Sequence, residues 1–149
     1  MFQLDEIDKK LLRELLKNSN RSQRELAKAI GVSTATVINH IQRLESAGVI
    51  KGYVPVVDPE YFGIGLSAII AVRISKGKLL ETQRKISQDF HVAAIYDVTG
   101  DWDSFIIGRF AGREDLNGFI KKLLAIPYVD RTVTHIVLNV VKEEPRVAV

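Results

Sequence analysis

The apolar residues of this 149-residue chain change their spacing near Gly52, and that change divides the sequence into two parts. Before Gly52 they recur every three or four residues, as they do along one face of a short helix. Beyond a connector, β-rich runs alternate with helical patterns. Because a chain of this length can bury a core without disulfides or metals, the sequence predicts a folded α+β protein.

Three short helices are predicted in the first part, over about residues 7–16, 23–30 and 34–47. Ser22 and Glu25 have the form of a capping box at the start of the second helix. Two short helices joined by a glycine-containing turn and covered by a third are typical of the helix-turn-helix motif. A structural or dimerising three-helix bundle has similar spacing and stays open as an alternative.

The third helix carries a small, polar outer face opposite its buried residues Val37, Ile41 and Leu44. Asn and Gln can pair with adenine, and Arg with guanine or phosphate. Hydroxyls and free N–H groups at a helix start suit phosphates. An ordinary solvent-exposed face, the alternative, normally carries more Glu and Lys. The predicted DNA-contacting residues are Ser22, Gln23, Ser33, Thr34, Ala35, Thr36, Asn39, His40, Gln42 and Arg43.

The distribution of charge gives modest support for a polyanionic partner. The formal net charge is +3, from 21 basic and 18 acidic residues. Between Arg21 and Lys51, five basic residues stand against two glutamates, which is a local excess of positive charge that phosphates could meet.

The composition excludes several classes of protein. Without cysteine, the chain has no disulfide, thiolate metal ligand or cysteine nucleophile. No apolar run is long enough to span a bilayer, and the first residues lack the pattern of a secretory signal. We therefore expect a cytoplasmic protein with no membrane partner.

The second part follows a connector, residues 49–59, which contains two prolines and one short predicted strand. Strands are predicted over residues 66–74, 92–98, 104–110 and 129–141, with one helix marked by Leu79, Leu80, Ile86 and Phe90 and another by Leu116 to Leu124. The order βαββαβ is that of a ferredoxin-like α/β sandwich. The predicted domains are residues 1–52 (helix-turn-helix), 53–61 (linker strand) and 62–149 (ferredoxin-like).

Patterns that carry catalysis or hold a cofactor are weak in this chain. Gly63–Ala68 matches a dinucleotide-binding pattern, but it leads into a strand rather than a helix. His40, His91 and His135 lack metal-ligand spacing and are expected to be hydrogen-bonded or exposed. We expect no metal, no cofactor and no enzyme activity. A βαββαβ enzyme or ligand-binding protein stays open as a less favoured alternative.

Four segments, taken in order, give a resemblance that spans nearly the whole chain: Leu4–Asp8, Leu44–Ile50, Val57–Pro59 and Thr99–Asp103. Together they resemble the Lrp/AsnC feast/famine transcription regulators. The resemblance implies a winged-type helix-turn-helix domain on double-stranded DNA, a linker strand, and a ligand-sensing domain that dimerises through its sheet. It also implies assembly of dimers into tetramers or octamers, with an amino acid or related metabolite bound near the hairpin turn.

The predicted hairpin turn has groups that suit a free amino acid as effector. Gly100 permits close backbone approach, and Asp101 and Asp103 can pair with an ammonium group. The predicted effector-binding residues are Thr99, Gly100, Asp101, Trp102, Asp103, Thr132, Thr134 and His135. An architectural DNA-binding protein that needs no effector is the alternative.

Overall fold

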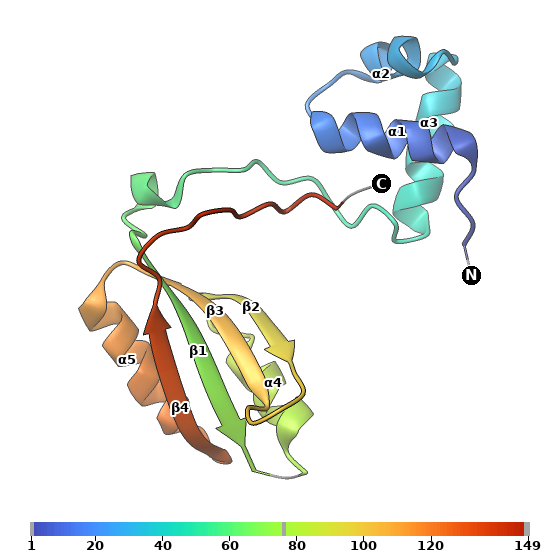
Figure 1. The fold of residues 1–149 in the computed structure, drawn as a ribbon. Helices are drawn as coiled ribbons and strands as arrows, with labels where there is room; N and C mark the ends of the chain where they lie inside the picture. The colour runs from blue at the N-terminus through green and yellow to red at the C-terminus, as the bar shows by residue number, and fades with distance from the viewer. Residues whose placement is uncertain (1, 76, 148–149) are drawn as a thin grey trace. The chain divides into compact units, whose positions relative to one another are not determined.

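The computed structural model of the chain describes residues 2–75 and 77–147 (Figure 1). Two compact units are present. Val57–Val141 forms one, and the residues up to Val56, joined by those after Val141, form the other. The residues after Val141 therefore lie with the first unit, whereas the sequence-based division counts them with the second. None of the described helices is long and apolar enough to cross a membrane.

Three helices build the first unit: α1 (Glu6–Lys17), α2 (Gln23–Ile30) and α3 (Thr34–Ser46). Gly31 ends α2 with a φ of 75°, a left-handed conformation that glycine adopts at little cost, and the chain then turns into α3. The predicted helix-turn-helix is thus formed. Its small core consists of Leu11, Leu15, Leu26, Ala27, Val37 and Leu44.

Local hydrogen bonds fix where each of these helices begins. The Asp5 carboxylate accepts from the backbone N–H of Asp8 at 2.8 Å, and the Asp8 carboxylate accepts from the N–H of Asp5 at 2.9 Å. Ser22 and Glu25 form the predicted reciprocal pair at α2, and Ser33 accepts from the third residue of α3. Since each cap contributes about 1 kcal/mol, the sequence itself specifies these three ends.

The second unit contains the predicted order of strands and helices, preceded by a short 3-10 helix. Its elements are η1 (Pro59–Phe62), β1 (Leu66–Ile74), α4 (Leu79–Ile86), β2 (Val92–Asp97), β3 (Ser104–Phe110), α5 (Arg113–Leu124) and β4 (Val129–Ile136). The strands pair antiparallel in the order β2-β3-β1-β4. Because α4 and α5 lie on one face of this sheet, the fold is the predicted ferredoxin-like sandwich (Figure 1).

Alternate residues of each strand point to opposite faces, which separates the core from an open face. On the side of the helices, Ile70, Val72 and Ile106 are fully buried and pack with Phe119 and Leu123 of α5. This single apolar layer holds the sheet and the helices together.

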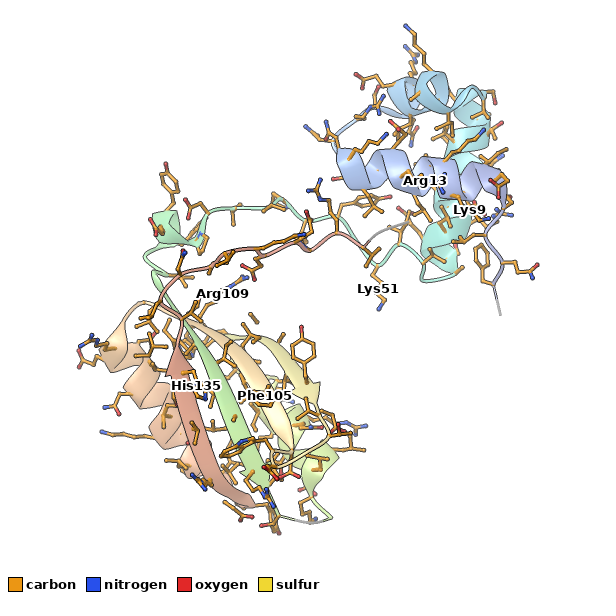
Figure 2. The ribbon with its side chains drawn as sticks, in the orientation of Figure 1. Lys9, Arg13, Lys51, Phe105, Arg109 and His135 are labelled. Carbon is orange, nitrogen blue, oxygen red and sulfur yellow. The ribbon has the colours of Figure 1, made fainter. Side chains whose placement is uncertain are left out.

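The open face of the sheet is also partly apolar. Ile69 is 36% exposed and Tyr96 is 56% exposed, and Phe105 and Ile107 lie half-buried beside them. Figure 2 marks Phe105 on this face. A contiguous apolar face of this kind normally needs a cover from another element or another chain.

Two predicted strands differ from the structure. Residues 51–58 form no strand, because an isolated extended segment has no partner to bond and Pro55 has no N–H to donate. The single chain thus lacks the predicted linker strand. β4 stops at Ile136 rather than Val141, because its partner β1 extends only as far as Leu66. α4 also ends before Phe90, which is 87% exposed.

His91 joins the turn before β2 to the first turn of α5. Its Nδ1 lies 2.6 Å from the Asp89 carboxylate, and its Nε2 lies 3.0 Å from that of Asp115. The prediction that the histidines are hydrogen-bonded or exposed is confirmed here, for His40, which bonds a carboxylate, and for His135, which is exposed.

We expect the open sheet face to hold two copies of the chain together. Phe105→Lys places a charge on this face, which cannot be buried without cost, and should give a monomer at micromolar concentration in sedimentation equilibrium. Leu80→Lys, at a residue of α4 that is 64% exposed, is the control and should leave association unchanged. If the Phe105→Lys protein sediments like the wild type, the contact between the two copies lies elsewhere.

Candidate functional site

α3 presents a stripe of exposed residues to solvent. Ala35, Asn39 and Gln42 are exposed and share one face at 3.6 residues per turn. Val37 and Leu44, each 0% exposed, fix the opposite side of the helix in the core. The side-chain amides of Asn39 and Gln42 make no hydrogen bond to another described residue, so both are available to a partner outside the chain.

The predicted phosphate-contacting residues gather at the starts of α2 and α3. Gln23 is exposed and Thr34 is half-buried in these first turns. The Ser33 hydroxyl bonds that of Thr36 at 2.8 Å, and the Ser22 hydroxyl bonds a carboxylate at 2.7 Å. Each serine hydroxyl also accepts from a backbone N–H of its helix, Ser22 from Glu25 and Ser33 from Thr36, so both serines act as helix caps.

Arg43 and His40 turn toward the start of α1. Arg43 donates to the carboxylates of Asp5, at 2.6 Å, and of Asp8. His40 Nδ1 lies 2.8 Å from the other Asp8 oxygen, and the Arg43 Cζ lies 5.5 Å from the centre of the Phe2 ring. Arg43 is exposed, as a residue of the outer face would be, but its guanidinium is engaged on α1. Asp5, Asp8, His40 and Arg43 are called the α1–α3 network below.

Asp8 is a buried carboxylate that remains ionised. Its side chain is 0% exposed, and burial alone would raise its pKa. Hydrogen bonds from Arg43, His40 and the Asp5 backbone outweigh burial and lower the pKa of Asp8 to about 2. The hydrogen bond to Asp8, followed by that to Asp5, raises the pKa of Arg43. Asp8 and Arg43 are therefore both charged at neutral pH.

The α1–α3 network contains side chains of the kinds that bind metals. Ligand atoms of Asp5, Asp8 and His40 all lie within 4.8 Å of one another. The Arg43 guanidinium already pairs with both carboxylates, so a positive charge occupies the place that a metal ion would take. The arrangement is that of an ion-pair network between two helices.

Acid should destabilise the first unit through Asp8. The pKa of Asp8 is about 2 in the folded chain against an ordinary 3.8. Its ionised form therefore stabilises the fold above about pH 4, by about 2 kcal/mol, and this is lost as the pH falls toward about 2. In thermal unfolding followed by NMR signals of α1 and α3, Asp8→Asn should melt below the wild type at neutral pH and near it in acid.

Glu6→Gln is the control for this prediction, because it removes an exposed carboxylate of α1 that pairs with Lys9 outside the network. Exposed pairs contribute little, so its melting should stay close to that of the wild type at neutral pH. A difference between Asp8→Asn and wild type that is equally large in acid would contradict the assignment to the Asp8 charge.

The turn predicted to bind an effector joins β2 to β3 and is fastened to the end of β1. The Asp103 carboxylate accepts from the N–H of Ile74 at 2.8 Å, and the Asp103 N–H donates to the Val72 carbonyl at 3.1 Å. Arg73 donates to the carbonyl of Asp101. The Asp103 carboxylate is therefore engaged inside the chain.

Asp101 presents the freer carboxylate of this loop. It is exposed, and its carboxylate makes no hydrogen bond or ion pair within the described part of the chain. The N–H groups of Gly100, Asp101 and Trp102 donate to no other described backbone group. Gly100 has a φ of 114°, and Thr99 beside it is exposed. The Trp102 ring lies 5.4 Å from the Arg131 Cζ.

The three candidates on β4 divide between the two faces of the sheet. Thr132 and Thr134 pair with core-facing residues of β1, whereas His135 pairs with Ile69 on the open face (Figure 2). His135 also lies farther along the strand from the loop than Thr132 does. One chain alone therefore does not bring the eight predicted effector residues to one side of the sheet.

Sequence reasoning missed two arginines beside the loop. Arg73 and Arg131 are paired across β1 and β4, where Arg73 holds the Asp101 carbonyl and Arg131 covers Trp102. Their guanidinium groups suit a carboxylate ligand. A single charge near the end of the apolar run 66–74 is the signal that could have identified Arg73.

A separate hollow of about 670 Å³ lies along α5 and is lined by His91, Asp115, Phe119 and Lys122, among others. It opens near the end of β3 that is remote from the loop. Charges of both signs line it, and the carboxylate of Asp115 already bonds His91. This hollow therefore does not select one class of ligand.

Protein families match both units of the chain. The model of the winged helix-turn-helix DNA-binding domain covers residues 4–51, and that of the Lrp/AsnC ligand binding domain covers residues 67–147. An uncharacterized HTH-type transcriptional regulator of Pyrococcus abyssi is 43% identical over 143 residues, which are 96% of this chain and 97% of the relative. The HTH-type transcriptional regulator FL11 of Pyrococcus horikoshii is 35% identical over 140 residues, 94% of this chain and 93% of FL11.

Solved structures share the architecture of both units. AsnC of E. coli matches with a TM-score of 0.87 at 26% identity, over 95% of this chain and 97% of AsnC. A transcriptional regulator of Neisseria meningitidis in complex with L-Met matches with a TM-score of 0.90 at 25% identity, over 98% of this chain and 97% of the relative. The similarity thus extends over the helical unit and the sheet unit.

Proposed function

Because the chain belongs to the Lrp/AsnC family of DNA-binding transcription regulators, we propose that α3 binds a specific double-stranded DNA sequence under the control of an amino acid or related metabolite. In this proposal α3 enters the major groove and α2 crosses the phosphate backbone. The main support for this proposal is that the side-chain amides of Asn39 and Gln42 are exposed and make no hydrogen bond to another described residue. An amide of this kind fits the donor and acceptor pattern of adenine.

Two copies of the chain are proposed to act together. The partly apolar open face of the sheet supports a homodimer, and two α3 helices would then meet half-sites about 34–36 Å apart, one turn of DNA. Further assembly into tetramers or octamers is part of the same proposal. We propose a cytoplasmic regulator that binds DNA and an effector and catalyses no reaction.

The loop between β2 and β3 is the proposed effector site. A free amino acid needs hydrogen-bond donors for its carboxylate and an acceptor for its ammonium. The N–H groups of residues 100–102 and the side chain of Arg73 would serve the carboxylate, and Asp101 the ammonium. The Neisseria relative in complex with L-Met supports an amino acid as the ligand class. A neighbouring subunit would complete the site, since the predicted effector residues on β4 lie on opposite faces of the sheet.

Asn39→Ala and Gln42→Ala should each weaken binding to the preferred DNA site by about 1–3 kcal/mol and relax one base position, because each removes an amide contact to a base. The site is first selected from genomic fragments, and affinities are then measured by fluorescence anisotropy. Gln88→Ala, the same change at an exposed residue of the sheet unit, is the control. If both α3 variants keep the sequence preference of the wild type, this face of α3 is not the surface that distinguishes bases.

Asp101→Asn should reduce the affinity for the effector at least about tenfold, because the ammonium loses its charged partner. Its DNA affinity without effector should stay within about tenfold, or about 1.4 kcal/mol. Calorimetry with the twenty amino acids identifies the ligand and then measures the variant. Asp97→Asn, at an exposed residue of the same hairpin, is the control.

The two loop carboxylates should behave differently. Asp103→Asn weakens the bond to the Ile74 N–H, so its main effect should be a lower melting temperature of the sheet unit. Unchanged effector affinity in Asp101→Asn would place the site elsewhere, and binding of none of the twenty amino acids would favour the effector-independent alternative.

A further inference from the structure

The α1–α3 network lies beside the face of α3 that is proposed to contact DNA. Arg43 follows Gln42 directly and is rotated from it by about 100° around the helix axis. An arginine at such a position is long enough to reach a phosphate or the edge of a guanine. In this chain, the carboxylates of Asp5 and Asp8 hold its guanidinium instead.

We propose that Asp8 is a positioning residue for DNA binding, because it keeps Arg43 away from the phosphates, limits the sequence-independent affinity and leaves base contact to Asn39 and Gln42. This inference rests on the proposed function of α3. It adds that Asn39 and Gln42 of α3 contact the bases, and that Asp8 of α1 keeps Arg43 from doing so.

The Asp8 carboxylate holds three partners at once. One oxygen accepts from Arg43 and from the N–H of Asp5 at 2.9 Å, and the other lies 2.8 Å from His40 Nδ1. Arg43 and His40 are three residues apart on α3, so they lie on neighbouring turns of the same side. The two bonds therefore fix both the guanidinium and the rotation of α3 against α1.

Burial makes this arrangement hard to undo. The side chain of Asp8 is 0% exposed, so the departure of Arg43 would leave a buried negative charge without its main partner. A phosphate contact at the protein surface offers Arg43 less, because water and salt screen it. The guanidinium therefore remains on α1 when DNA approaches α3.

Retention of Arg43 has a consequence for the affinity for DNA. A guanidinium that meets a phosphate attracts every DNA sequence alike, whereas the amides of Asn39 and Gln42 distinguish bases. An arginine released at this place would strengthen binding to all sequences. The carboxylate of Asp8 thus lowers the part of the affinity that does not depend on sequence.

The experiment compares full-length wild type with four variants: Asp8→Asn, Glu6→Gln, Arg43→Ala, and the double variant Asp8→Asn with Arg43→Ala. Affinities for the selected site and for a scrambled duplex of equal length are measured from about 50 to 200 mM salt. Glu6→Gln is the matched control, because it removes one carboxylate from the first turn of α1 whose partner is Lys9. It changes the net charge as Asp8→Asn does but leaves Arg43 in place.

Asp8→Asn should steepen the slope of log affinity against log salt by about 0.9, the effect of one new phosphate contact, and should strengthen binding to the selected and the scrambled duplex alike, so that the ratio of the two affinities stays unchanged. Glu6→Gln should do neither. The double variant should return to the wild-type slope, and Arg43→Ala alone should leave the slope unchanged. A purely structural role of Asp8 would not give this dependence on Arg43.

Either of two results would overturn the inference. Asp8→Asn with the slope and the affinities of Glu6→Gln would show that Asp8 does not restrain Arg43. Arg43→Ala with a slope shallower by about 0.9 would show that Arg43 already contacts a phosphate in the wild type. In either case, if the wild type still prefers its selected site to the scrambled duplex, the proposed function of α3 is not contradicted. If the wild type shows no such preference, both the proposed function and this inference are overturned.

Circular dichroism establishes whether Asp8→Asn folds. If it does not, Arg43→Gln takes its place, because the glutamine amide can still donate to the Asp8 carboxylate while the charge of Arg43 is removed. Its slope should equal that of the wild type, and a slope shallower by about 0.9 overturns the inference, since Arg43 would then contact a phosphate in the wild type.

Discussion

The helical unit depends on one carboxylate that is both buried and charged. A buried charge is tolerated only with close partners, and Asp8 has Arg43 and His40 from α3 as well as the N–H of Asp5. The same side chain therefore caps α1 and sets the rotation of α3. Once that rotation is fixed, Asn39 and Gln42 are directed outward, which joins the packing of the unit to the surface proposed to bind DNA.

The sheet unit is organised by the alternation of side chains across its strands. One face is covered by α4 and α5, and the other leaves Phe105 and Ile107 half-buried. The same alternation sends Thr134 to one face and His135 to the other. The effector site proposed at the β2–β3 loop would therefore be coupled to association of the chains, since a second subunit is proposed to complete it.

The sequence predicts those features that depend on neighbours in the chain. The helix cap at Ser22, and the order of strands and helices, follow from local spacing, and both are present. The direction of the Arg43 guanidinium depends on a carboxylate 35 residues away, so helical periodicity alone could not show that it bonds α1. Periodicity also could not show where β4 ends, because that depends on how far its partner extends.

In the loop between β2 and β3, the roles of single residues likewise could not be predicted from the sequence. Asp101 and Asp103 are chemically equivalent in the sequence, and only the fold shows that Asp103 meets the N–H of Ile74 while Asp101 stays exposed. Arg73 and Arg131 belong to strands that are distant in the chain, so pairing of β1 with β4 is needed to bring them to the same loop.

The most direct test of this account is a crystal structure of the full-length protein on a DNA site selected from the genome. We expect Asn39 and Gln42 to lie within hydrogen-bond distance of base edges in the major groove, while Arg43 remains bonded to Asp8. A complex in which Arg43 has left Asp8 for the DNA, or in which the outer face of α3 points away from the groove, would contradict it.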